Sequence, residues 1–395
     1  MTHAVPSPAD LLRDLVAIPS VNPMGREVEG PEYLEGRVTA YLMAFFERLG
    51  VPHQSIEVLP GRHNVVARFD NPGATTTLLL DAHQDTVPVE GMTIPPFTPT
   101  VRDGRMYGRG SCDVKGGLAT IMSVLARLIR ERPPGRANVV VSCTCDEEQY
   151  ASGARDLVKL WTDPARAGSL LPAAPDLAVV MEPTDLDIVV AHRGAVRWKL
   201  RTRGVACHSS RPHEGVNAIY KMSRVLAALE RYADELPRMV PPHPLCGTAT
   251  LSVGRIEGGI SVNTVPDECV IEIDRRVIPG ENPAEVIPHV ERYLRGRIDD
   301  DFEMLPPWIE GATLSDRDNG PWADRLMQHI EQVVGPRSKI GVPYGTNASR
   351  LVLGHIPAVV FGPGSIDQAH TKDEFLELSQ LDQAVEILYR FCAAP

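Results

Sequence analysis

The sequence predicts an α/β protein with a mixed, largely parallel central sheet covered by helices, into which a smaller α+β domain is inserted. In the first half of the chain, continuous apolar runs alternate with amphipathic helical patterns, which is typical of strands buried on both faces. From about residue 194 the strands instead alternate polar and apolar residues, which is typical of a sheet with one solvated face. The length of 395 residues also favours two domains over one.

The elements expected in the first domain follow in order along the chain. Helices are expected at 9–18, 32–49, 114–130 and 152–161, and strands at 64–69, 77–82, 138–145 and 177–181. The second helix is expected to end at Gly50, because glycine commonly ends helices and Pro52 follows. After about residue 306 the same style resumes, with helices at 321–334 and 378–392 and a strand at 358–361.

The inserted part is expected to follow a β-α-β-β-α-β order, as in ferredoxin-like domains. Its strands are expected at 196–202, 249–256 and 268–277, and its helices at 215–233 and 283–296. The predicted domains are therefore a discontinuous one, residues 1–193 with 306–395, and an inserted one, residues 194–305.

Composition narrows the partners that we expect. The net charge of −11 argues against nucleic acid and anionic membranes, since binding phosphate needs clustered Lys and Arg. The sequence shows neither a signal peptide nor an apolar run long enough to span a membrane. Seven scattered cysteines, an odd number, do not resemble a disulfide framework. We expect a cytoplasmic protein acting on a small molecule.

The glycine-rich stretch from Gly108 to Gly117 carries one acidic residue, Asp113, directly before an amphipathic helical pattern. Glycines allow the backbone to turn tightly and to approach whatever the carboxylate holds. Taken alone, this pattern favours an ordinary helix N-cap for Asp113.

Other side chains of types that bind metals are expected at the same edge of the sheet as Asp113. Strand ends, the loop after a fourth strand and the helix start at Asp113 provide six candidates: His83, Asp113, Glu147, Glu148, Glu182 and His370. In open α/β sheets, sites form at the carboxyl ends of the strands, so we expect these groups to converge. Four carboxylates close together would raise one another's pKa values. Two divalent cations would balance them, and mixed nitrogen and oxygen ligands suit zinc better than calcium or magnesium.

Two further interpretations concern the strand ends. Asp85 lies two residues after His83, on the same side of an extended segment, so its carboxylate could accept the second ring N–H of His83 and fix the tautomer. Asp85 could also be a simple turn residue. Glu147 and Glu148 point in different directions, so one could bind metal while the other acts as a base; a solvated acidic strand end is the alternative.

Seven runs, in order along nearly the whole chain, resemble the M20 family of co-catalytic zinc peptidases and deacylases. They are LLLDAHQDTVP, GRMYGRGSCDVKGG, SCTCDEE, MEPT, AHRGAV, HSSRPHEGVNAI and FGPGSIDQAHTKDEFLE. The resemblance is closest to the branch of acetylornithine deacetylase and succinyl-diaminopimelate desuccinylase. It implies a zinc-peptidase-like catalytic domain and an inserted lid domain through which two subunits form a homodimer.

The resemblance also implies roles for single residues. Two Zn²⁺ or Co²⁺ ions per subunit would be held by His83, Asp113 and Glu182, and by Asp113, Glu148 and His370, with Glu147 as general base. In the inserted domain, His208 would stabilise the transition state in the partner subunit, and Asn263 and Arg276 would hold the substrate carboxylate. Without the resemblance, His208 and Arg276 would be taken for surface residues.

The implied reaction is metal-assisted hydrolysis of the amide bond of an N-acyl-L-amino acid. On this resemblance, N-acetyl-L-ornithine is the favoured substrate, and the reaction would belong to arginine biosynthesis. The alternatives are succinyl-diaminopimelate, another N-acyl amino acid such as acetylcitrulline, and a dipeptide. A non-catalytic relative that only binds a ligand is the remote alternative, because Glu147 and all the ligand positions are present.

Overall fold

The computed structural model describes residues 6–166 and 169–395, which form two compact units. The first unit comprises Met1–Val190, Asp316–Ile340 and Thr346–Pro395, and the second comprises Ala191–Ser315 and Gly341–Gly345. The second unit thus interrupts the first in sequence. That it serves as a lid or dimerises remains a prediction.

A mixed sheet forms the centre of the first unit. In spatial order its strands are β1 (His53–Leu59), β2 (Arg62–Phe69), β6 (Asn138–Thr144), β3 (Thr77–His83), β7 (Leu177–Val180), β15 (Ala358–Val360), β8 (Ile188–His192) and β14 (Lys339–Val342). The neighbours from β6 to β15 run parallel, whereas β1 pairs antiparallel with β2, β2 with β6 and β8 with β15. The predicted α/β class with a largely parallel centre is confirmed.

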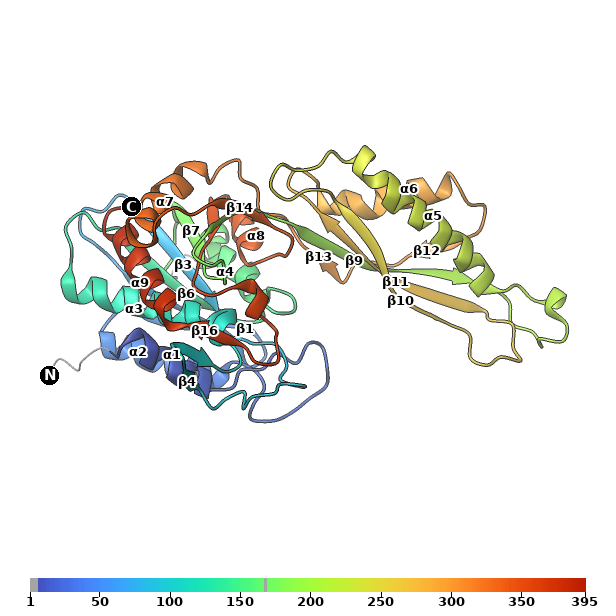
Figure 1. Ribbon diagram of the computed structural model, residues 1–395. Helices are drawn as coiled ribbons and strands as arrows, with labels where there is room; N and C mark the ends of the chain where they lie inside the picture. The colour runs from blue at the N-terminus through green and yellow to red at the C-terminus, as the bar shows by residue number, and fades with distance from the viewer. Residues whose placement is uncertain (1–5, 167–168) are drawn as a thin grey trace. The chain divides into compact units, whose positions relative to one another are not determined.

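Helices cover both faces of this sheet (Figure 1). They are α1 (Pro8–Ala17), α2 (Gly36–Leu49), α3 (Gly116–Glu131), α4 (Ser152–Thr162), α7 (Gly320–Val334), α8 (Ala348–Leu351) and α9 (Leu378–Ala393). The apolar stripe of α3 that the sequence predicts is fully buried, including Leu118, Ile121 and Leu125, and packs against β3 and α9. The core therefore lies directly behind the strand ends that carry the candidate ligands.

The structure differs from the sequence prediction at several helix ends. The helix expected from residue 32 begins at Gly36, because Tyr33 forms a bridge with Val21 instead. The helix expected from residue 114 begins at Gly116, because Asp113 and Val114 have non-helical backbone angles. Strands β1, β8 and β14 were not predicted, nor was the small sheet of β4 (Thr100–Arg102), β5 (Arg105–Tyr107) and β16 (Phe375–Glu377).

The second unit is a five-stranded antiparallel sheet with two helices. Its strands are β9 (Gly194–Arg203), β10 (Thr250–Gly258), β11 (Glu268–Val277), β12 (Phe302–Met304) and β13 (Ile309–Glu310), and its helices are α5 (Ala218–Met239) and α6 (Val286–Arg295). Helix α5 starts at Ala218 rather than residue 215, because the side chain of Asn217 caps it. Strand β9 alternates as expected, with Trp198 buried and Arg197 on the opposite face, paired with Asp274 at 2.6 Å.

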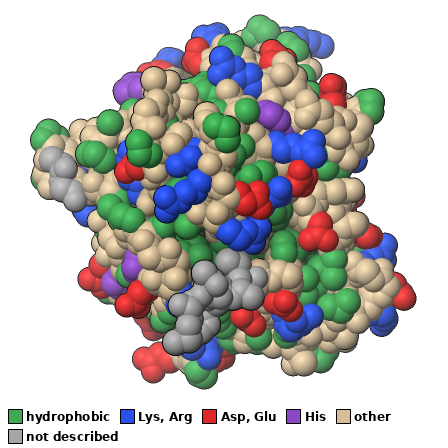
Figure 2. All heavy atoms as spheres, turned by 90° about the vertical axis from the view of Figure 1, so that its left-hand side faces the viewer, with side chains coloured by type: hydrophobic (Ala, Val, Ile, Leu, Met, Phe, Trp, Pro, Cys, Tyr) green, Lys and Arg blue, Asp and Glu red, His purple; other side chains and the backbone are tan. Residues whose placement is uncertain are grey.

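The surface and the thiols add two observations. On the face of Figure 2, basic and acidic side chains are interspersed. All seven cysteines are free thiols, and Cys143 and Cys145 are fully buried. Across the described residues, the helices are either too short or too polar to traverse a bilayer.

Candidate metal centre

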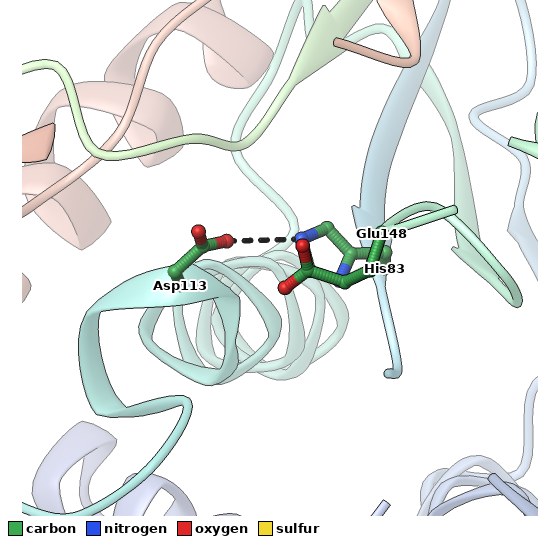
Figure 3. Close-up of side chains that lie close together, drawn as sticks. All are labelled: His83, Asp113 and Glu148. Atoms are coloured by element: carbon green, nitrogen blue, oxygen red, sulfur yellow. Dashed lines mark hydrogen bonds and ion pairs between the residues drawn. The ribbon is translucent and has the colours of Figure 1, made fainter. Parts of the chain in front are cut away.

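The carboxyl ends of three parallel strands bring the predicted ligands together. His83 ends β3, Glu148 follows β6 and Glu182 follows β7. One ligand-type atom from each of His83, Asp113 and Glu148 lies within 4.8 Å of the others. Figure 3 shows the carboxylate of Asp113, at the start of its helical segment, facing the imidazole of His83.

Asp113 sits at the centre of the cluster. Its Oδ1 lies 3.1 Å from Nε2 of His83, and its Oδ2 lies 3.2 Å from Nε2 of His370. The same nitrogen of His370 lies 3.3 Å from Oε2 of Glu148. The carboxylate of Asp113 therefore faces two imidazoles from distant parts of the chain, rather than capping α3 as the alternative interpretation had it.

Burial differs among these side chains. Asp113, His83 and Glu182 are buried, whereas the side chain of His370 is 55% exposed. Glu147 is only partly buried. The cluster thus has a closed side, formed by the sheet, and an open side at His370.

The contact between Asp85 and His83 differs from the prediction in the oxygen atom that Asp85 provides. Nδ1 of His83 lies 2.9 Å from the backbone oxygen of Asp85, whereas the nearest carboxylate oxygen of Asp85 is 3.6 Å away, beyond hydrogen-bonding distance. The carboxylate instead accepts the backbone N–H groups of Glu147 and Glu148, each at 3.1 Å. Asp85 still orients His83, but through its main chain, and its side chain holds the turn that carries both glutamates.

Glu374 is a buried residue of the site that the sequence did not single out. Its carboxylate accepts the backbone N–H groups of Gly110, Cys112 and Asp113 at 2.9–3.0 Å, and the guanidinium of Arg109 at 2.8 Å. It therefore fixes the glycine-rich turn that presents Asp113. The only signal in the sequence is an acidic residue soon after His370, which does not reveal this partner.

Asn347 is a further buried residue that supports the site. Its side-chain amide donates to Oδ2 of Asp81, at 3.0 Å, and to the hydroxyl of Thr144, at 2.9 Å. Burial raises the pKa of Asp81, which lies within β3, to about 6. Asn347 thus stabilises a buried carboxylate between two strands that end at the cluster.

The cluster carries more negative charge than its imidazoles can balance. Burial, followed by repulsion from Glu148, raises the pKa of Glu147 to about 8, against the attraction of His83. Burial likewise raises the pKa of Glu148 to about 7, and it carries that of Glu182 well above its usual range. Hydrogen bonds to Asp113 and Glu148 raise the pKa of His370 to about 10. These raised pKa values mean that the carboxylates of the cluster tend to retain protons.

Divalent cations fit this donor set. Oε1 of Glu148 is buried and has no hydrogen-bond partner among residues 6–166 and 169–395, as expected of an oxygen that faces a ligand. The mixed imidazole and carboxylate donors match the ligand preferences of zinc and its neighbours. A cation would replace the protons that the carboxylates and imidazoles otherwise hold.

The residues predicted for the lid all lie in the second unit. His208 is exposed, and its Nδ1 lies 2.7 Å from the hydroxyl of Ser210. The backbone oxygen of Asn263 accepts the N–H of Ser209 at 3.0 Å, so His208 and Asn263 lie on neighbouring segments. Arg276 pairs with Asp274 at 2.8 Å and is partly exposed.

Arg275 and Arg276, although adjacent, differ in surroundings. Arg275 is 1% exposed and forms an ion pair with Glu281, whereas Arg276 is 34% exposed on the opposite face of β11. Arg275 is therefore a structural residue of the second unit, and only Arg276 is accessible to a ligand.

An imidazole–carboxylate cluster at the carboxyl ends of parallel strands defines a candidate metal-dependent hydrolase, and the comparisons with known proteins agree. Residues 79–394 match the model of peptidase family M20/M25/M40. The acetylornithine deacetylase of Vibrio campbellii is 34% identical over 371 residues, which cover 90% of each chain.

Solved structures share the fold at lower identity. A tripeptidase from Staphylococcus aureus is 21% identical, with a TM-score of 0.76 over 98% of both chains. The YXEP protein from Bacillus subtilis, described as a dinuclear metal-binding peptidase of family M20, is 18% identical, with a TM-score of 0.65 over 98% of this chain and 96% of its own. The chain belongs to peptidase family M20 and is a metal-dependent amidohydrolase.

Proposed function

We propose that the protein is a deacylase that hydrolyses the amide bond of an N-acyl-L-amino acid, and that its preferred substrate is N-acetyl-L-ornithine. The observation that carries this proposal is the 34% identity to an acetylornithine deacetylase over nine-tenths of both chains, since the peptidase neighbours are more distant in sequence. The reaction would belong to arginine biosynthesis, in the cytoplasm.

Two metal ions would be held by the predicted ligands, and we propose zinc or cobalt. His83, Asp113 and Glu182 would hold one ion, and Asp113, Glu148 and His370 the other. Bound there, the ions would supply Lewis acidity at the scissile carbonyl and a lowered pKa for the attacking water.

The chain's own residues perform the proton transfers. Glu147 is partly exposed beside the cluster, and its carboxylate is suited to take a proton from the attacking water and to pass it to the departing amine. Asp85 holds the backbone of Glu147 in place, so the base need not be ordered when substrate binds.

The second unit would supply the remaining groups. We propose that it is the lid domain and that His208 stabilises the oxyanion in the partner subunit of a homodimer. Asn263 and Arg276 would orient the substrate carboxylate, Arg276 through its planar fork of donors. Support for the dimer comes from β10, which is the edge strand of its sheet, and from exposed apolar side chains nearby, among them Ile256 and Ile260.

The proposal is tested by measuring product release from a panel of N-acetyl-L-ornithine, N-acetyl-L-citrulline, N-succinyl-diaminopimelate and dipeptides. The protein is loaded with Zn²⁺ or Co²⁺, and Glu147→Gln serves as the inactive control of matched shape. Acetate release from acetylornithine well above the others supports the proposal. Preferential turnover of succinyl-diaminopimelate or of a dipeptide would refute the substrate assignment while leaving amide hydrolysis in place.

A further inference from the structure

A buried group of charges lies directly behind the turn that carries Glu147 and Glu148. Its members outside the motifs are Glu35, which precedes α2, and Arg62, which begins β2. Glu35 is fully buried and Arg62 is 7% exposed. Buried charges of this kind require partners of opposite charge or hydrogen bonds. Here the partners include residues of the turn at the candidate site.

The guanidinium of Arg62 lies close to three carboxylates, those of Glu35, Asp146 and Asp85. Its Nε donates to both oxygens of Glu35, at 3.1 and 3.0 Å, and its Nη1 donates to Oδ1 of Asp146 at 2.6 Å. Its Nη2 lies 3.8 Å from Oδ2 of Asp85. Arg62 thus links Asp146, the residue before Glu147, with Asp85, whose carboxylate accepts the N–H groups of the Glu147–Glu148 turn.

These carboxylates hold three consecutive backbone N–H groups. The N–H of Asp146 donates to Glu35 at 3.2 Å, and those of Glu147 and Glu148 donate to Asp85 at 3.1 Å each. Asp146 has a φ of +59°, in the left-handed region, which non-glycine residues adopt uncommonly and which Asp tolerates better than most. The direction in which both glutamate side chains leave the backbone is therefore set by contacts from behind.

We propose that Arg62 and Glu35 are positioning residues, which hold the 146–148 turn so that Glu147 and Glu148 face the cluster. Arg62 binds Glu35 and Asp146 by hydrogen bonds and lies close to Asp85, so that Glu35 and Asp85 stay beside the turn, where each carboxylate accepts one or two of its N–H groups. Without Arg62, the buried carboxylates of Glu35, Asp85 and Asp146 would repel one another, and the hydrogen bonds that hold the turn would be weakened. The assignment of Glu147 as a base rests on the proposed function, whereas the positioning of Glu148 does not.

The test compares Arg62→Met and Glu35→Gln with a matched control, Arg127→Met. Arg127 forms ion pairs with Glu131 and Glu386 in the same unit, three helical turns along α3 from the site. For each full-length protein, hydrogen exchange of the amides of residues 146–148 is measured without metal. Co²⁺ affinity is then measured by chelator competition, and kcat and KM are measured separately.

We expect faster exchange at residues 146–148 in both variants and Co²⁺ binding about 10–100-fold weaker than in the wild type, the usual effect of losing support behind a metal ligand. The fall in activity should be in kcat, with KM nearly unchanged, because the base is displaced rather than the substrate-binding groups. Arg127→Met should change none of these.

The inference is overturned if Arg62→Met lowers only thermal stability and leaves exchange and Co²⁺ affinity at wild-type values. If Arg62→Met does not fold, the nearly isosteric Glu35→Gln decides the question by the same readouts. If the wild type hydrolyses no amide in the panel, but the variants show faster exchange and weaker Co²⁺ binding, the proposed function fails and the positioning role stands.

Discussion

Glu374 offers the sharpest test of how the turn that presents Asp113 is held. Glu374→Ala removes the buried carboxylate that accepts the N–H groups of Gly110, Cys112 and Asp113 and pairs with Arg109. Arg109 is itself 3% exposed, so its charge would be left buried without its partner. The substitution should therefore destabilise the first unit and release Asp113.

The magnitude follows from these contacts. Removing one partner of a buried ion pair costs about 3–5 kcal/mol in the free energy of unfolding, and the orphaned N–H groups place this variant at the upper end. For a domain of this size, such a loss lowers Tm by about 6–20 °C. Displacement of Asp113 should also weaken metal binding about 10–100-fold.

Thermal unfolding and Co²⁺ titration would be measured on Glu374→Ala and on a neighbouring control, Glu377→Ala. Glu377 pairs with Arg105 through side chains that are 39% and 41% exposed, so its loss should cost about 0–1 kcal/mol. If the two variants lose the same stability, or if Glu374→Ala binds Co²⁺ as tightly as the wild type, Glu374 does not support the turn as described.

Three further predictions concern the cluster itself. Glu147→Gln should lower kcat by about 10²–10⁴-fold while leaving metal content unchanged; loss of metal in this variant would make Glu147 a ligand instead of the base. Because the raised pKa values of Glu148 and His370 leave protons on the metal-free site, metal binding should release protons and weaken as pH falls, which calorimetry in buffers of different ionisation enthalpy would detect; no proton release would contradict the ligand set. In chelated protein, the ion pair of His370 with Asp113 stabilises the fold fully below pH 6.5, the ordinary pKa of histidine, and loses this effect as pH rises through about 10, so Tm should fall over that window; a Tm independent of pH in chelated protein would contradict this.

The sequence predicted that these side chains would lie close together, but it did not predict the contacts that support them. His83, Glu148 and Glu182 could be assigned to one edge of the sheet from the sequence. Buried strands are recognisable as apolar runs, and the carboxyl ends of parallel strands lie at the same edge. For Asp85, the i and i+2 spacing correctly placed it beside His83, but the spacing could not decide between its backbone and its carboxylate oxygen. That choice depends on the turn at Glu147, which belongs to another strand.

Glu35, Arg62 and Glu374 could not be found in this way. Each acts on a backbone segment between about 80 and 260 residues away in sequence, and neither periodicity nor local spacing encodes such a contact. Their burial as charged residues identifies them only once the fold is known, because a buried charge requires a partner. The roles of His208, Asn263 and Arg276 still rest on the resemblance, and they remain predictions.

The most direct test of the central claim is the metal content of the purified, dialysed protein, counted per chain after loading with Zn²⁺ or Co²⁺. The account predicts two ions per chain in the wild type, and fewer than two in His370→Ala, which removes one proposed ligand from the exposed side of the cluster. A wild-type protein that binds no metal, or one that binds the same number of ions as His370→Ala with equal affinity, would contradict the account.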